Sequence, residues 1–330
     1  MKCFLAPIIS VVAVYGADNL DRTAVRTSER PMDYTTLPSD ASAHSRTKWS
    51  GDVHLLIDDA GAPSLFVFDR SGKRISGTLL QIPGADQLRV TDFAAGPDRT
   101  IWASGQAVSR QGQQSFFLAR IAPDGSEAQV IQTTPFQVRQ LAVAPDSTVW
   151  AVGREISKDR SGNWIPLDMA QHVLRHFDGS GRLIASSVAL NSVGMARVMS
   201  GYLVATRDRV GWYAPANGVG VYAEFGTDMT PIATYPASAL AGDHSLTWGF
   251  ALTQRGNAFL LLAHPKLAAS GPALLGLDRT SGEWAIVSGV PTDSRGTFPM
   301  LLGSDGESLI FRGPPDKTKL QVLDVRIGQR

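Results

Sequence analysis

Two closely similar stretches recur in the sequence, Asp92-Phe-Ala-Ala-Gly-Pro-Asp-Arg-Thr-Ile-Trp-Ala-Ser-Gly105 and Gln140-Leu-Ala-Val-Ala-Pro-Asp-Ser-Thr-Val-Trp-Ala-Val-Gly153. Each consists of a short apolar run, a Pro-Asp turn and a second apolar run that carries a Trp. Proline fixes φ, aspartate hydrogen-bonds back to the turn backbone, and β-branched and aromatic residues favour strands. Both stretches therefore predict a tight β-hairpin.

Weaker copies of this hairpin occur at Gly249–Leu262 and Pro299–Phe311, so the turns recur about every fifty residues, with one interval doubled. We expect the missing turn near Ser200-Gly201. A second hairpin type alternates with the first, as in Leu65-Phe-Val-Phe-Asp-Arg-Ser-Gly72 and Leu174-Arg-His-Phe-Asp-Gly-Ser-Gly181. The repeat is therefore predicted to contain four strands joined by short turns, which is the pattern of a propeller blade.

Six such blocks fit the chain, and the sixth lacks its outer strand because the sequence ends just after Gly328. A propeller leaves blade edges unpaired unless it closes on itself. We therefore predict an all-β fold, a six-bladed β-propeller closed by an N-terminal strand that completes the last blade, and we place that strand within Asp33–Ser42. Seven blades would require a repeat that we do not find.

These motifs resemble the NHL/YVTN-type bacterial β-propellers. The resemblance rests on the phrase Ala-Pro-Asp-x-Thr-hydrophobic-Trp-Ala-x-Gly, followed by Phe-Asp-x-x-Gly-Arg, and covers almost the whole chain after its N-terminal segment. It implies the propeller fold but no particular activity, because the group includes ligand-binding modules, lactonases and lyases.

The composition agrees with a turn-rich β protein. The chain has 330 residues, 32 Gly and 19 Pro, and its acidic residues are 24 Asp against 6 Glu. Aspartate and glycine favour turns, whereas the helix-forming Glu and Lys are scarce. The formal net charge of +1 argues against a strongly cationic nucleic-acid-binding protein, and we expect no nucleic-acid partner.

The N-terminal sequence has the features of an export signal peptide. Lys2 precedes an apolar run from Cys3 to Tyr15, and small or tolerable residues before Ala17 suit cleavage there. We therefore expect a signal peptide at 1–16, a polar leader at 17–50 that supplies the closing strand, and the β-propeller at 51–330. The mature protein is then periplasmic or secreted, without Cys or a membrane span, and we expect a monomer. A buried N-terminal strand is the alternative for the apolar run.

Candidate ligand-binding residues come from aligning the blocks. The alignment places Thr91-Asp92, Arg139-Gln140, Arg197, Thr247-Trp248 and Phe298 at the entrances of the innermost strands, on the face of the long, variable loops. Arginines near an aromatic ring suit an anionic or aromatic ligand. The competing interpretation is that these side chains only plug the channel and cap neighbouring strands.

Three further features remain open. Asp243 and His244 lie in a predicted loop near the channel mouth, where they are weak candidates for a general base. Trp164, in the longest loop, could contact a glycan or protein or could cover its blade. His172 and His176 lie four residues apart on a predicted strand, so their rings are too far apart to share a metal, and we assign no metal ligands.

We therefore predict a binding module for a small ligand or an envelope or extracellular protein, without catalysis or a cofactor. The alternative is a metal-dependent lactonase- or lyase-like propeller enzyme that uses a divalent ion such as calcium at the channel mouth. The sequence does not decide whether the protein is an enzyme.

Overall fold

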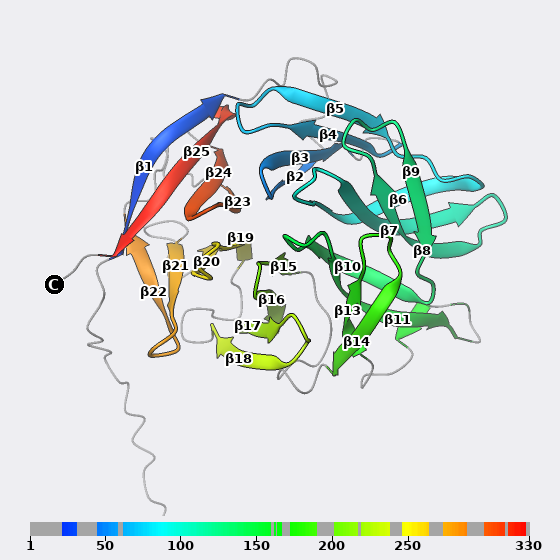
Figure 1. The fold of residues 1–330 in the computed structure, drawn as a ribbon. Helices are drawn as coiled ribbons and strands as arrows, with labels where there is room; N and C mark the ends of the chain where they lie inside the picture. Colours follow the sequence, from blue (N-terminus) through cyan, green and yellow to red (C-terminus); the bar gives the residue numbers. More distant parts are fainter. Residues whose placement is uncertain are drawn as a thin grey trace, which may run out of the picture.

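The computed structural model describes residues 22–31, 45–58, 62–159, 162, 164–166, 172–189, 201–216, 219–237, 246–263, 273–288, 300–313 and 316–327. These residues form strands and turns, with no helix among them. The strands make six blades of antiparallel strands arranged around an axis, and Figure 1 shows this ring. The predicted six-bladed β-propeller is therefore confirmed. Within the described part of the chain, no helix is long and apolar enough to cross a membrane.

The blades follow one another along the chain, each running from the axis outward. Blade 1 contains β2 (Ser45–Ser50), β3 (Val53–Asp58), β4 (Ser64–Phe68) and β5 (Arg74–Leu79). Blade 2 contains β6 (Ala85–Ala95), β7 (Ile101–Ser109), β8 (Gln114–Ile121) and β9 (Ala128–Gln132). Blade 3 contains β10 (Phe136–Val143), β11 (Val149–Lys158), β13 (His172–Phe177) and β14 (Leu183–Ala189), with β12 (Trp164–Pro166) beside β11.

The second half of the ring repeats this order. Blade 4 contains β15 (Tyr202–Ala205), β16 (Arg209–Ala216), β17 (Val219–Gly226) and β18 (Pro231–Pro236). Blade 5 contains β19 (Leu246–Leu252), β20 (Ala258–Ala263), β21 (Ala273–Asp278) and β22 (Glu283–Ser288). Blade 6 contains β23 (Met300–Asp305), β24 (Ser308–Gly313) and β25 (Asp316–Ile327), and its outer strand is β1 (Arg22–Pro31).

The Pro-Asp turns have the chemistry that the sequence indicates. Asp98 accepts hydrogen bonds from the backbone N–H of Thr100 at 3.0 Å and from its hydroxyl at 2.8 Å. Asp146 does the same for Thr148, at 3.0 and 2.7 Å. These side-chain bonds fix the tight turn between the first two strands of blades 2 and 3.

The ring is closed by an N-terminal strand, as predicted, but the strand lies earlier in the chain than Asp33–Ser42. β1, at Arg22–Pro31, pairs antiparallel with β25 from Arg22↔Ile327 to Pro31↔Lys319. Two residues at its start also pair in parallel with β22 of blade 5. Residues 33–42 lie outside the described part of the chain.

Two further expectations differ from the structure. β2 is the innermost strand of blade 1, so this blade includes the end of the segment that we assigned to the leader. In blade 4 the first turn is at Thr206–Asp208 instead of Ser200-Gly201, because Thr206 N–H bonds to the Arg209 carbonyl at 2.8 Å. The run from Val210 to Ala216 belongs to the second strand of this blade. The stretch Val210-Gly-Trp-Tyr-Ala-Pro-Ala-Asn-Gly218 resembles the second hairpin type, and so predicts the third strand instead.

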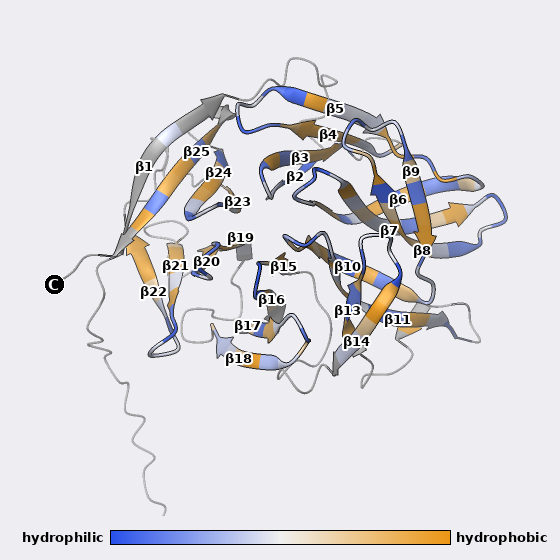
Figure 2. Ribbon diagram, viewed as in Figure 1, coloured by the Kyte–Doolittle hydropathy of each residue, from blue (hydrophilic) through white to orange (hydrophobic). Residues whose placement is uncertain are grey.

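The core lies between the faces of adjacent blades. The described residues form six buried hydrophobic clusters, and each cluster joins one pair of neighbouring blades. One of them packs Trp49 and Phe68 of blade 1 against Leu302 and Ile310 of blade 6, so side chains also close the ring. In Figure 2 many blade strands carry hydrophobic colour, whereas many of the turns carry hydrophilic colour.

The Trp of the repeat is part of this core. Trp102 and Trp150, on the second strands of blades 2 and 3, are 2% and 1% exposed. Trp212 has the same place in blade 4 and is 0% exposed. Burying such large side chains is among the strongest apolar contributions that one residue can make. The repeated Trp therefore has a structural role.

Candidate functional site

A cavity of about 850 Å³ occupies the centre of the ring. Residues from all six innermost strands line it, namely β2, β6, β10, β15, β19 and β23. The lining continues into the turns that follow these strands, including Gly51, Pro97 and Gln254. The cavity thus extends along the inner strands to the face of the short turns, which is opposite the face on which we expected function.

Four of the inner strands carry a bulge at the same level. The register shifts between Val90 and Asp92 in β6 and between Val138 and Gln140 in β10. It also shifts between Thr247 and Gly249 in β19 and between Leu301 and Gly303 in β23. The extra residues are Thr91, Arg139, Trp248 and Leu302. A bulge re-aims side chains, and the residues from the block alignment in blades 2, 3 and 5 lie at these bulges.

Glycines of the second strands allow the bulges in blades 2 and 3. A Cβ at Gly105 would lie 2.2 Å from the Arg89 carbonyl oxygen. A Cβ at Gly153 would lie 2.3 Å from the Gln137 carbonyl oxygen. These are the last residues of the two Trp-Ala-x-Gly motifs, so the motif glycine is required by the close approach of the bulged strand.

An ion pair joins three blades inside the cavity. Lys48 Nζ lies 3.2 Å from Asp92 Oδ2, and it donates a hydrogen bond to the Leu141 carbonyl at 2.9 Å. Asp92 Oδ2 also accepts a hydrogen bond from Leu141 N–H at 2.7 Å. Lys48 and Asp92 are 21% and 19% exposed in their side chains. This arrangement fixes both charges and neutralises them.

Arg46 supports the same inner wall. Its two terminal nitrogens donate hydrogen bonds of 2.7 Å to the carbonyls of Thr91 and Val90 at the β6 bulge. Its guanidinium lies 5.9 Å from the centre of the Phe93 ring. These contacts hold the inner strand of blade 1 against that of blade 2.

Two aromatic residues contribute to the cavity wall. Trp248 is half-buried and packs against the cluster between blades 5 and 6. Tyr202 is also half-buried, with its ring centre 6.5 Å from that of Phe250. Burial, together with Tyr213 and Asp92, raises the pKa of Tyr202 to about 12. The Tyr202 hydroxyl therefore remains a hydrogen-bond donor at neutral pH.

The predicted ligand-binding residues do not form one group. Asp92 and Trp248 line the cavity, whereas Arg139 is not part of its lining. Trp164 begins β12, where its backbone pairs with Lys158 of β11. Arg197 and Phe298 lie outside the described residues, as do Asp243 and His244. The alignment of the repeat blocks did not identify Lys48, which the structure adds to the site.

No group of three His, Cys, Asp or Glu side chains that could hold a metal occurs within the described ranges. His176 stacks on Trp150, with ring centres 3.9 Å apart and planes inclined by 13°. Burial lowers the pKa of His176, an effect that the nearby Asp146 partly opposes. His176 therefore packs in the blade as a neutral ring.

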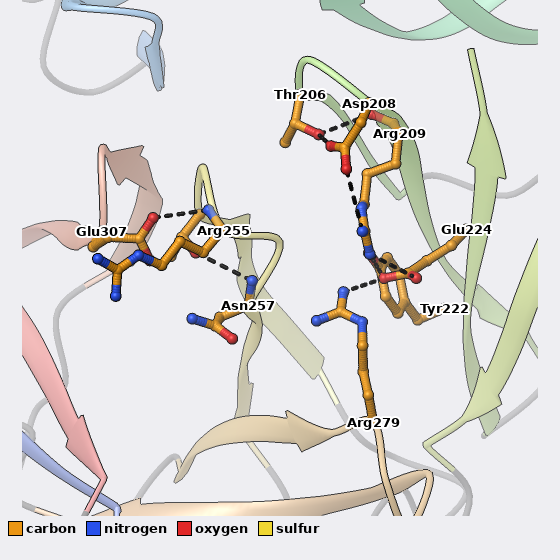
Figure 3. A network of polar contacts seen from close by, with 10 residues as sticks. Thr206, Asp208, Arg209, Tyr222, Glu224, Arg255, Asn257, Arg279 and Glu307 are labelled. Atoms are coloured by element: carbon orange, nitrogen blue, oxygen red, sulfur yellow. Dashed lines mark hydrogen bonds and ion pairs between the residues drawn. The ribbon is translucent and has the colours of Figure 1, made fainter.

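A second charged network, shown in Figure 3, joins blades 4 and 5. The Glu224 carboxylate is 1% exposed and accepts hydrogen bonds from Tyr222 at 2.8 Å, from Arg209 at 3.4 Å and from Arg279. The turns of blades 5 and 6 meet where Arg255 N–H bonds to Glu307 at 2.8 Å. Because partners satisfy Glu224, this network holds the blades together and offers no reactive carboxylate.

Comparison with known proteins identifies the fold alone. No protein family and no curated protein matches the chain by sequence. Among solved structures, it is similar to a Bacteroides fragilis protein named provisionally as exported, with 11% identity, a TM-score of 0.51, and 93% of this chain and 96% of that chain covered. It is also similar to the PQQ-bound form of an aldose sugar dehydrogenase from Streptomyces coelicolor, with 11% identity, a TM-score of 0.50, and 94% and 100% covered.

Proposed function

We propose that this protein is a β-propeller binding module that holds a small, polar, uncharged ligand in its central cavity and performs no chemistry on it. The volume of about 850 Å³ carries this proposal, because it lies within the range of small-molecule sites. Asp92 and Trp248 are its candidate contact residues, together with Tyr202.

Most charged side chains of the wall are engaged within the protein, which supports an uncharged ligand; the exposed Arg207 also lines the cavity, at its turn end. Lys48 and Asp92 neutralise each other, and Arg46 donates to backbone carbonyls. At the turn end of the cavity, Asp52 pairs with Arg99 at 2.9 Å and Arg70 pairs with Asp305 at 2.6 Å. A ligand with hydroxyl or carbonyl groups and an apolar face, such as a sugar or a lactone, suits this wall.

Tyr202 offers the sharpest test of the cavity. Its hydroxyl is a donor at neutral pH, and the change Tyr202→Phe removes only that group. The matched control is Tyr235→Phe, because Tyr235 lies on the outer strand β18 of the same blade, against Tyr222, and does not line the cavity.

The experiment is a thermal-shift screen of the protein against uncharged sugars and lactones, followed by calorimetric titration of each compound that raises Tm. We expect Tyr202→Phe to weaken binding about fivefold, which corresponds to about 1 kcal/mol for one hydrogen bond. Tyr235→Phe should leave the affinity unchanged. The proposal is wrong if no compound raises Tm or if both variants bind as the wild type does.

The same screen, extended with Ca²⁺ and with PQQ plus an electron acceptor, tests the enzyme alternatives. A Tm increase with Ca²⁺, combined with hydrolysis of a lactone, would replace the proposal with the metal-dependent enzyme. Oxidation of an aldose in the presence of PQQ and an electron acceptor would replace it with a dehydrogenase.

Export is a separate part of the proposal. The apolar run Cys3–Tyr15 supports a cleaved signal peptide. Expression of the full chain in a bacterium, followed by N-terminal sequencing of the extracytoplasmic fraction, should give a mature protein that begins at Ala17. Retention of the full-length protein in the cytoplasm would contradict it.

A further inference from the structure

Three arginines of blades 2 and 3 lie around the bulges of the inner strands. Arg89 is on β6, Arg139 is the extra residue of the β10 bulge, and Arg154 is on β11, opposite Gln137. The hydrogen bond between Leu141 N–H and Asp92 fixes β6 beside β10, so Arg89 and Arg139 lie at a similar level along the axis. Along these two strands, Arg89 and Arg139 lie farther from the short turns than the cavity-lining residues do.

The acidic residues of these strands are engaged with other cations. Asp86 pairs with Arg110 at 3.7 Å, Asp92 with Lys48 at 3.2 Å, and Glu155 with Arg175. No other Asp or Glu occurs on β6, β7, β10 or β11. Within the part of the chain that the structure describes, no carboxylate forms an ion pair with Arg89, Arg139 or Arg154.

The three arginines bring positive charges close together, which is unfavourable. Arg139 is half-buried, and burial lowers its pKa, as do the charges of Arg154 and Arg89. Arginine nevertheless stays protonated near neutral pH. The Arg154 Nε is buried and has no hydrogen-bond partner among the residues that the structure describes. Buried donors and charges are normally satisfied, so a bound anion would supply what the protein does not.

We propose that Arg89, Arg139 and Arg154 form a binding site for a small polyvalent oxyanion, either a phosphate or a polycarboxylate. Guanidinium groups bind both chemistries through paired N–H donors. None of the three residues lines the central cavity, so this site is distinct from the one under Proposed function and stands or falls separately. It gives the propeller a charged recognition point outside the central cavity.

The test titrates inorganic phosphate and citrate into the mature protein by calorimetry, with the ionic strength held constant by NaCl. We expect saturable binding of at least one anion, and the preferred anion identifies a phosphate or a carboxylate ligand. Arg139→Gln should weaken that binding at least tenfold, since it removes the half-buried charge that lies near both of the other arginines. The control is Arg120→Gln, an exposed arginine on β8 of blade 2.

A second readout does not depend on a ligand. In anion-free buffer Arg139→Gln should raise Tm, because it relieves repulsion among like charges. If this variant fails to fold, Arg89→Gln carries the same binding test at an exposed position. The proposal is overturned if neither anion binds, or if the folded Arg139 or Arg89 variant binds as tightly as the Arg120→Gln control.

Discussion

Acidification should destabilise the protein through one buried histidine. His54, on β3, is 0% exposed, with its ring centre 5.7 Å from that of Phe68, and it shares a hydrogen bond with the Thr47 hydroxyl. Burial lowers the pKa of His54 to about 3, and the charge of Arg312 adds to this effect. The folded protein therefore holds His54 neutral, whereas the unfolded chain binds a proton near pH 6.5.

The size of the effect follows from this difference. Between pH 6.5 and pH 3 the unfolded state carries a proton that the folded state excludes, so the stabilisation present above pH 6.5 is lost as the pH falls. The slope approaches about 1.4 kcal/mol per pH unit. From pH 6.5 to pH 4.5 the free energy of unfolding should decrease by about 2 kcal/mol because of His54 alone.

Urea unfolding at pH values between 6.5 and 4.5, for the wild type and for His54→Gln, measures this loss. Hydrogen bonds within their turns lower the pKa values of Asp124 and Asp228, so these groups lose their stabilising effect mainly below this window. The free energy of unfolding of the wild type should fall about 2 kcal/mol more than that of the variant. Equal slopes for the two proteins would refute the assignment of a neutral, buried His54.

Three further predictions concern stability. Arg279→Met removes one of the cations on the buried Glu224 and should lower the free energy of unfolding by about 2 kcal/mol in urea titrations; an unchanged midpoint would mean that the blade 4–5 network is not stabilising. Gly153→Ala places a Cβ 2.3 Å from the Gln137 carbonyl oxygen and should lower the free energy of unfolding by about 2 kcal/mol. A variant whose Tm equals that of the wild type would contradict the need for glycine at this bulge. Deletion of residues 1–31 removes β1 and exposes the edge of β25, so calorimetry and light scattering should show a lower Tm and self-association; a monomer of unchanged Tm would contradict closure by β1.

Local turn chemistry explains why the fold is predictable. The turns at Asp98 and Asp146 combine Pro, Asp and Thr, and each residue type makes a local contact that does not depend on the rest of the fold. Blade 4 lacks this signal, because its first turn at Thr206–Asp208 contains neither Pro nor Gly. The Asn217-Gly218 pair, which follows its second strand in the sequence, instead resembles the turn expected after a third strand.

The candidate sites depend on contacts that no local pattern encodes. Lys48 and Asp92 are far apart in sequence, and Lys48 lies on a strand that we expected to be part of the leader. Arg89 and Arg154 join Arg139 only through the strand pairing and the bulges of two blades. Block alignment could find Arg139, Asp92 and Trp248 because they occupy equivalent levels of the repeat, but it carries no information on which side chains meet.

A crystal structure of residues 17–330 with the tightest ligand from the screen would test the central-cavity proposal most directly. We predict electron density for the ligand inside the ring, with a hydrogen bond to Tyr202 and contact with Trp248. Density confined to the outer surface, with the inner strands free of ligand, would contradict the proposal that the propeller binds its ligand at the axis.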